Sequence, residues 1–274
     1  MKRSLFLFTA SMLLIIMAGC SKTNDGQGRL TINITDGPFP LNSIESATVE
    51  INKVEIRKTG DGVSDERPFI VIWEGTKVFN LLELRNGVVE KLADLEIPAG
   101  EYDLIRLYVE EAGLKVKDGD QFSVTVPSGK QTGIKIFIDP GLVVEGGLSA
   151  ELLLDFDLTG SFILQGNMHS PAGIKGFHFK PVIRAVNNST AGRIEGTVKE
   201  KDAGPLKDAR VYLDMEDDTL KAFTDENGRY AFIGIAPGLY PVSAVQTDYD
   251  SLVVEDVKVI SGNRTIQNFE LTKE

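Results

Sequence analysis

The chain has 274 residues and a formal net charge of −11, from 29 basic and 40 acidic side chains. This length suggests about two domains. The acidic balance argues against nucleic acid as a partner, because its phosphates would be repelled. It also argues against adsorption to anionic lipid through charge. The single cysteine excludes an internal disulfide.

The first twenty residues have the pattern of a cleaved export signal. Lys2 and Arg3 precede an apolar stretch over residues 5–17. That stretch is shorter than the roughly 20 apolar residues that span a bilayer. Two small residues then lead to Cys20. We predict a signal peptide over residues 1–19, and the alternative is an ordinary secretory signal with an incidental cysteine.

The Ala-Gly-Cys sequence at residues 18–20 resembles the lipobox of bacterial lipoproteins. In that family the cysteine thiol receives a diacylglycerol, the chain is cut before it, and the new amino terminus is usually acylated. The resemblance implies lipidation at Cys20, with palmitate-like chains holding the protein to a membrane. It also implies a place in the cell envelope, at the periplasmic or the surface face of the outer membrane. Residues 20–28 are polar and are expected to be a flexible tether.

Residues 29–187 show the apolar–polar alternation of half-buried strands, separated by Gly, Pro and Asp. This pattern is typical of an all-β sandwich, Ig-like or prealbumin-like. One segment departs from it, because Val88, Leu92 and Leu95 have helical spacing. They predict a short helix over residues 88–95.

A change of parity marks the second predicted strand. Val49 and Ile51 alternate on one parity, and Val54 and Ile56 alternate on the other. One extra residue inside a strand produces this change, so we predict a β-bulge at residues 52–53.

Residues 188–192 are small and polar and are the predicted linker. Seven short strands are then predicted within residues 193–274, the last over residues 265–271, which is the size of one small sandwich. In both domains a Pro-Gly turn precedes a tyrosine that starts a long strand, at Tyr102 and at Tyr240. This echo suggests related construction of the two domains.

The second domain resembles the carboxypeptidase regulatory-like family, which has a prealbumin-like sandwich. The matching motifs occur in the family's order at residues 196–198, 205–211, 224–232 and 237–240. The resemblance implies no catalytic residues. The family is grouped with carbohydrate-binding-like folds, but many members are structural spacers.

The first domain is similar to a domain of unknown function, DUF4382, found in exported proteins. The similarity lies in Leu30 to Pro38, which contains Asp36-Gly37-Pro38 where the family usually has Asp-Ala-Pro, and in residues 81–84, 97–102 and 179–184. It implies no established activity.

No catalytic residues are predicted. His169 lies in a predicted loop and His178 alternates with apolar residues on a predicted strand. The chain lacks the spacing of known nucleophile, zinc-protease and P-loop motifs. Asp155 and Asp157 share a strand face and could serve as an acid–base pair, but an acidic chain brings such pairs together by chance. We therefore expect that the chain is not an enzyme and that it needs no cofactor.

Calcium is the metal with candidate ligands, at Asp214, Asp217, Asp218 and Asp225. The last of these lies in an Asp-x-Asn-Gly sequence, which is also ordinary hairpin chemistry with Gly228 at the tight position. We favour the hairpin, and we predict no metal.

Aromatic platforms for a glycan are offered by Trp73, the only tryptophan, and by Tyr249 in a polar turn. Residues 218–220 and 250–252 resemble O-glycosylation tripeptides of exported proteins. Two functions stay open. One is a non-catalytic anchored lipoprotein that presents two β-sandwiches for binding or adhesion to a protein or glycan partner. The other is a carbohydrate-binding accessory protein of a glycan-uptake system.

Overall fold

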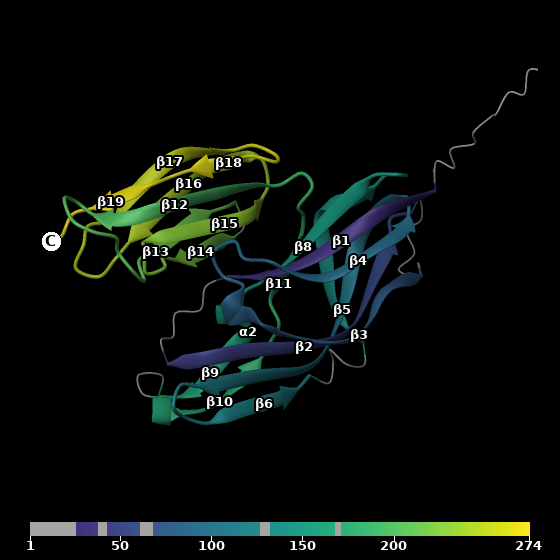
Figure 1. Ribbon diagram of the computed structural model, residues 1–274, viewed down its shortest axis with the longest axis horizontal. Helices are drawn as coiled ribbons and strands as arrows, with labels where there is room; N and C mark the ends of the chain where they lie inside the picture. The colour runs from purple at the N-terminus through teal and green to yellow at the C-terminus, as the bar shows by residue number, and fades with distance from the viewer. Residues whose placement is uncertain (1–25, 38–42, 61–67, 127–131, 168–170, 217) are drawn as a thin grey trace, which may run out of the picture.

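The computed structural model describes residues 26–37, 43–60, 68–126, 132–167, 171–216 and 218–274. Cys20, His169 and Asp217 lie outside these ranges, as does the predicted signal peptide. Within the described ranges, no helix is both long and apolar enough to cross a membrane. The predicted all-β class is confirmed, because strands dominate both domains (Figure 1).

The described part of the first domain contains eleven strands and three short helical turns. The strands are β1 (Gln27–Asp36), β2 (Ile44–Lys58), β3 (Phe69–Asn80), β4 (Glu90–Pro98), β5 (Gly100–Val116), β6 (Gln121–Thr125), β7 (Ile134–Val144), β8 (Ser149–Phe156), β9 (Phe162–Gly166), β10 (Ile174–Phe179) and β11 (Ile183–Asn187). The helical turns are η1 (Leu81–Glu83), α2 (Leu158–Ser161) and η2 (Pro171–Gly173).

Most of these strands belong to one nine-stranded sheet. Its order is β3-β2-β5-β7-β11-β8-β1-β4, with β6 paired to β5, and β9 and β10 form a separate hairpin. The sheet folds over so that its two ends approach each other. Lys77 in β3 forms an ion pair with Glu90 in β4 at 3.0 Å. The two layers of the predicted sandwich are therefore two halves of a single sheet.

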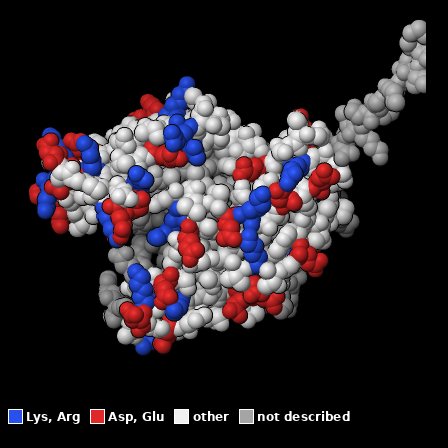
Figure 2. All heavy atoms as spheres, viewed as in Figure 1, with Lys and Arg blue, Asp and Glu red and all other residues white. Residues whose placement is uncertain are grey.

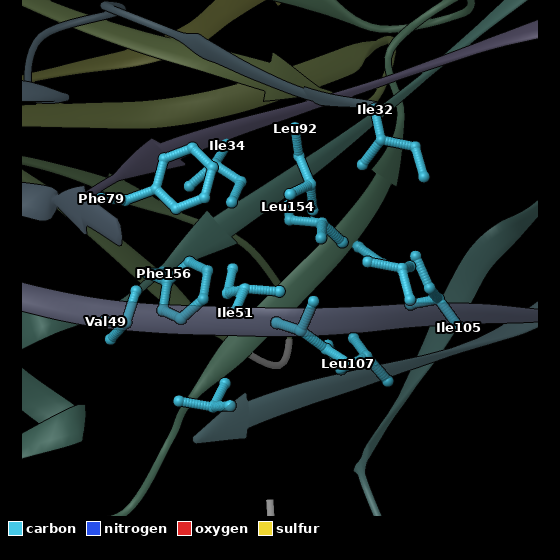
Figure 3. Close-up of a cluster of buried hydrophobic side chains, with 14 of the residues drawn as sticks. Ile32, Ile34, Val49, Ile51, Phe79, Leu92, Ile105, Leu107, Leu154 and Phe156 are labelled. Carbon is cyan, nitrogen blue, oxygen red and sulfur yellow. The ribbon is translucent and has the colours of Figure 1, made fainter. Parts of the chain in front are cut away.

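The core of the first domain lies between these halves. Figure 3 shows Ile32, Ile34 and Leu154 of β1 and β8 together with Ile51 and Leu107 of β2 and β5 in one apolar cluster. All five side chains are fully buried. Burying an aliphatic side chain of this size is worth about 1.5–3 kcal/mol, so the apolar alternation decides which side of each strand faces inward.

The bulge predicted in β2 is confirmed. The pairing register of β2 shifts between Ile51 and Lys53 against both of its neighbours, β3 and β5. Because of the extra residue, Ile51 and Val54 are both buried although their positions differ in parity.

The helix predicted over residues 88–95 is wrong, because most of this segment forms β4. This strand pairs antiparallel with β1, and the register shifts between Ile32 and Asn33. The shift leaves an extra residue in β4, so that Leu92 and its neighbour Ala93 are both buried. A bulge thus interrupted the two-residue period and imitated helical spacing.

The second domain is a sandwich of two four-stranded sheets with its own core. The strands are β12 (Gly192–Glu200), β13 (Arg210–Asp214), β14 (Thr219–Phe223), β15 (Arg229–Ile235), β16 (Gly238–Val245), β17 (Leu252–Val259), β18 (Arg264–Ile266) and β19 (Phe269–Leu271). One sheet holds β15-β12-β18 with β19 also on β12, and the other is β14-β13-β16-β17.

The strand predicted over residues 265–271 is interrupted, and its two parts, β18 and β19, both pair in parallel with β12. Between them the carbonyl of Gln267 lies very close to Gly196, where a Cβ would be 1.7 Å from its oxygen. The buried hydroxyl of Tyr230 donates to the same carbonyl at 2.7 Å. Only glycine allows this approach, which gives the motif at residues 196–198 a packing role.

The two turns that precede Tyr102 and Tyr240 have the same hydrogen bond. The hydroxyl of Tyr102 donates to the carbonyl of Pro98 at 2.6 Å, and that of Tyr240 donates to the carbonyl of Ala236 at 2.8 Å. Each bond reaches four residues back and ties the turn to the start of β5 or β16.

Candidate ligand-binding site between the two domains

The two domains touch through a small apolar contact. Leu153 of β8, Val186 of β11 and Ala191 pack together with Ile233 of β15. Gly234 follows with φ +66°, and a Cβ there would lie 2.9 Å from the Leu153 side chain. The second domain consequently lies next to β8 and β11, as Figure 1 shows.

A cavity of about 740 Å³ lies at this contact. The first domain lines it with residues from β1, β7, β8, α2 and β11, and the second domain lines it with residues from β14 and β15. Val186 and Ile233 of the apolar contact belong to its wall. Ligand pockets in proteins have volumes of about 300–1,000 Å³ and often lie between domains.

Asp36, the last residue of β1, is the most unusual side chain of this wall. It is 5 % exposed, and neither carboxylate oxygen accepts a hydrogen bond of normal geometry from the described residues. Its backbone amide donates to the carbonyl of Leu84 at 3.1 Å, and the amide of Gly37 donates to Phe156 at 2.8 Å. The backbone therefore holds the side chain in place without satisfying it.

Burial raises the pKa of the Asp36 carboxyl well above its ordinary value. The negative charges of Asp155 and Asp157 raise this pKa further. The backbone amide of Leu158 and the charge of Arg85 oppose the shift. Apart from this Leu158 contact, the carboxylate of Asp36 has no hydrogen-bond donor among the described residues.

Asp155 and Arg184 form an ion pair at 2.7 Å across β8 and β11, with side chains 17 % and 27 % exposed. The same guanidinium donates to the carbonyl of Gly234 in the second domain at 3.1 Å. Arg184 therefore joins the two domains. Its Nε–H is buried without a partner in the described part of the chain. Burial raises the pKa of the Asp155 carboxyl, and the charge of Arg184 opposes this.

Asn187, at the end of β11, also has a buried polar side-chain atom without a hydrogen-bond partner among the described residues. Its amide nitrogen donates to the carbonyl of Gly141 at 3.4 Å, but its side-chain oxygen is buried and unpartnered among the described residues. Asp36, Arg184 and Asn187 all line the cavity, but their unpartnered atoms have almost no accessible surface. Buried polar groups are normally hydrogen-bonded, so these three residues are an unusual part of the fold.

Apolar side chains form much of the remaining wall. Phe137 of β7 stands out because this lining residue is 70 % exposed, whereas Phe156, which also lines the cavity, is buried. An exposed aromatic ring beside convergent polar groups is a common feature of ligand sites.

The sequence did not single out Asp36, Arg184 or Asn187. Asp36 lies in a Thr-Asp-Gly-Pro sequence, which is ordinary turn chemistry. Only its position in the motif shared with the DUF4382 family could have drawn attention to it. The cavity brings together residues more than a hundred positions apart, and no local spacing indicates that.

The aspartates considered as calcium candidates act as turn caps where the structure describes them. Asp214 accepts from the Thr219 hydroxyl at 2.9 Å, and Asp218 accepts from the Thr219 amide at 2.8 Å. Asp225 accepts from the amides of Asn227 and Arg229, both at 2.8 Å. Among the described residues, no three His, Cys, Asp or Glu side chains lie together as a metal site would need.

The glycan candidates Trp73 and Tyr249 lie in different domains, and neither lines the cavity. Trp73 of β3 is half-buried against the first core. Tyr249 packs against the second core and donates its hydroxyl to Glu200 at 3.0 Å. The structure thus does not combine them into one surface.

The residues weighed for catalysis have structural partners. Asp157 caps α2 by accepting from the Gly160 amide at 3.0 Å, and Asp155 pairs with Arg184. His178 is exposed on β10 and contacts the side chain of Gln165 at 2.6 Å.

Family models match both domains. Residues 27–181, more than half of the chain, match the domain of unknown function DUF4382, and residues 193–272 match the carboxypeptidase regulatory-like domain. The chain therefore belongs to the DUF4382 family and carries a carboxypeptidase regulatory-like domain behind the first. Both family resemblances drawn from the sequence are confirmed. No curated protein matches the chain in sequence.

Solved structures share only a distant likeness with this chain. The shaft pilin SpaA from Lactobacillus rhamnosus GG is 9% identical over 90% of this chain and 98% of the pilin, with a TM-score of 0.28. The Bacillus anthracis TIE protein is 14% identical over 90% of this chain and 34% of its own, with a TM-score of 0.26. The 3-chlorocatechol 1,2-dioxygenase from Rhodococcus opacus 1CP is 14% identical over 31% of this chain and 61% of the enzyme, with a TM-score of 0.24. The chain spans less than two thirds of the last two proteins, and these TM-scores relate no function to it.

Proposed function

We propose that this chain is a non-catalytic lipoprotein of the cell envelope, anchored through acyl chains on Cys20, whose two β domains bind a partner or ligand. The export signal and the lipobox resemblance support the anchor. The acidic body supports it indirectly, because such a surface gains nothing from anionic lipid. Figure 2 shows basic and acidic side chains interspersed on the face in view. We place the anchor in the outer membrane.

The observation that carries the binding role is the cavity of about 740 Å³ between the two domains. Its wall combines the exposed Phe137 ring with polar side chains from both domains, such as Lys135 and Lys221. A concave, largely apolar site of this size with a few polar groups is the usual form of a ligand pocket.

We propose no reaction for this cavity because of the side chains that line it. Its wall, which consists entirely of described residues, contains no histidine or cysteine. The hydroxyls of Thr35 and Thr190 donate to backbone carbonyls, that of Thr219 donates to Asp214 within a turn, and Asp155 is held by Arg184. Hydrolytic catalysis needs a nucleophile, a base and a group that orients the base, and these contacts favour binding instead.

The anchor is tested by expressing the full chain and its Cys20→Ala variant with labelled palmitate. We expect the wild-type protein to take up label and to sediment with outer membranes, and the variant to do neither. Label in the variant, or a wild-type protein whose intact mass carries no acyl group, would contradict the proposal. Protease treatment of intact cells then distinguishes the surface from the periplasmic face.

A carbohydrate-binding accessory protein of a glycan-uptake system is the second candidate. The exposed Phe137 ring at the cavity favours it, because sugars stack on aromatic faces and their hydroxyls both donate and accept. A glycan array tests it with the full protein and the Phe137→Ala variant. Spots that bind the wild type and not the variant support this function, and blank arrays reject it.

A further inference from the structure

We propose that the end of the first domain next to Cys20 lies on the membrane surface and contacts it through Leu148 and Val143. The second domain and the cavity then point away from the membrane. This inference rests on the proposed anchor, because an anchored chain keeps this end close to a bilayer. It commits to a zwitterionic lipid surface as the occupant, as opposed to a second copy of the chain or another protein.

The start of β1 determines which end of the first domain can reach the membrane. Gln27, the first residue of this strand, lies seven positions after Cys20. A chain of this length spans at most about 25 Å even when it is fully extended. Figure 1 shows that β1 begins at the end of the first domain that lies away from the second domain. An anchor at Cys20 therefore keeps this end within about 25 Å of the lipid.

The turn between β7 and β8 belongs to the same end. The amide of Gly147 donates to the carbonyl of Gln27 at 2.8 Å. The amide of Arg29 donates to the carbonyl of Leu148 at 2.9 Å. The amide of Leu148 donates in turn to the carbonyl of Glu145 at 3.2 Å and closes the turn. These backbone bonds hold Leu148 directly beside the first residues of the fold.

This end of the domain presents apolar side chains to solvent. Leu148 is 58 % exposed, and Val143, near the end of β7, is 53 % exposed. Apolar side chains gain free energy when they leave water for the boundary between headgroups and acyl chains. A short tether keeps the effective concentration of lipid surface high, so a contact of this small size is sufficient.

The charges at this end select the kind of lipid. Glu145 belongs to the turn itself, and Glu96 and Glu101 are exposed on the strands beside it. Two cations lie here as well, but the guanidinium of Arg29 is in an ion pair at 2.6 Å. The ammonium of Lys58 donates to a backbone carbonyl at 2.6 Å. The carboxylates repel anionic headgroups, so a zwitterionic surface fits better.

The cavity lies at the opposite end of β1. Asp36, the last residue of the strand, is one of the lining residues. A strand rises about 3.3 Å per residue, so Asp36 is about 30 Å from the start of the strand at Gln27. With the turn at residues 145–148 on the lipid, the cavity faces the aqueous side. A partner or ligand then approaches it from solution.

The test is hydrogen–deuterium exchange, followed by mass spectrometry, on the chain that begins at Cys20. Because Cys20 is the only cysteine, its thiol can be coupled to a maleimide lipid in phosphatidylcholine vesicles, whether or not cells acylate it. We expect the amides of residues 145–148 to exchange roughly threefold more slowly on vesicles than in the free chain. Those of the exposed turn at residues 201–204 should exchange equally in both, and phosphatidylglycerol should reduce the protection.

Two variants show which side chain makes the contact. Leu148→Ser removes the apolar side chain without removing the backbone bonds of the turn, so most of the protection should be lost. Leu239→Ser is the matched control, because Leu239 of β16 is 59 % exposed in the second domain and does not line the cavity. This variant should keep the protection of the wild type. Circular dichroism verifies that both variants are folded.

Equal exchange of residues 145–148 with and without vesicles overturns the inference. Protection that survives in Leu148→Ser also overturns it, as does protection that appears at residues 201–204 instead. Protection that rises with protein concentration in the absence of lipid would identify a second copy of the chain as the occupant and would overturn it too. Acylation is measured separately, on protein made in cells, so failure of the anchor and failure of the contact are distinguished.

Discussion

Neither carboxylate oxygen of Asp36 accepts a hydrogen bond of regular geometry from the described residues, although its backbone amide is hydrogen-bonded. Leaving a buried polar group unsatisfied costs about 1–3 kcal/mol, so this residue lowers the stability of the fold. The same reasoning applies to the unpartnered atoms of Arg184 and Asn187 beside the cavity.

The raised pKa of Asp36 predicts how stability depends on pH. The folded state holds this proton more tightly than the unfolded chain, whose carboxyl has the ordinary value of 3.8. The contribution is therefore fully present below that value and is lost as the pH rises through the raised folded pKa. At pH 7 we expect the free energy of unfolding of Asp36→Asn to be about 1–3 kcal/mol larger than that of the wild type. Near pH 3 we expect the two proteins to be equally stable.

Asp94 is the control for this prediction, because its pKa is shifted in the opposite direction to that of Asp36. Hydrogen bonds from Arg29 and Lys91 lower the pKa of its exposed carboxyl. Its contribution is therefore present above the ordinary value and is lost as the pH falls. Urea titrations at several pH values should show Asp94→Asn less stable than the wild type at pH 7. An Asp36→Asn protein that is also less stable there would contradict our account of Asp36.

At the scale of the strand, Gly196 allows β12 to accept both β18 and β19. A Cβ at this position would collide with the backbone carbonyl of Gln267 at 1.7 Å. We expect Gly196→Ala to cost about 3 kcal/mol of stability, because a backbone clash cannot be relieved by rotating a side chain. Gly204 has nothing within 4 Å of its Cβ position, so Gly204→Ala should be nearly neutral. Equal melting temperatures for the two variants would refute this.

The two tyrosine turns offer a second comparison at this scale. Tyr102 is fully buried, whereas the bond from Tyr240 is exposed. Removing the hydroxyl leaves a carbonyl unsatisfied, which costs more where water cannot replace it. Chemical denaturation should show Tyr102→Phe destabilised by about 1–2 kcal/mol and Tyr240→Phe by about 0.5 kcal/mol. The reverse order would mean that the turns differ in some other way.

Most strands could be predicted from the sequence, because the two-residue period is a local property of each strand. The bulge in β2 was predictable for the same reason, since Val49, Ile51, Val54 and Ile56 are close together. The bulge in β4 was mistaken for a helix because Leu92 and Ala93 are adjacent and both buried. Local pattern cannot distinguish these two cases without the partner strand.

The candidate site could not be predicted, for a different physical reason. Asp36, Asp155 and Arg184 come together only through the pairing of β1 with β8 and of β8 with β11. The carbonyl of Gly234 comes from the other domain. Sheet order and domain contact depend on the whole chain. Local sequence patterns therefore do not show that these residues lie close together.

At the scale of the molecule, Arg184 joins the two domains and the cavity. It bonds to Asp155 in its own domain and to Gly234 in the other. We expect Arg184→Ala to cost about 1–3 kcal/mol, because a partly buried partner is left uncompensated. It should also separate the unfolding of the two domains in calorimetry. Arg193→Ala removes a cation 50 % exposed in its pair with Glu195 and should change stability by less than about 0.5 kcal/mol.

An Arg184→Ala protein that still unfolds in one transition of unchanged midpoint would contradict the joining role. Separated transitions would show that the cavity wall depends on a contact between domains. A ligand that bridges the wall should then draw the two transitions together, since it binds only the joined form.

The central claim is that the chain is a membrane-anchored lipoprotein whose two β domains act in binding. The most direct measurement is the intact mass of the full protein, expressed in a bacterium and extracted from its membranes. We predict a chain that begins at Cys20 and carries acyl groups. A mass that retains residues 1–19, or that carries no acyl group, would contradict the account.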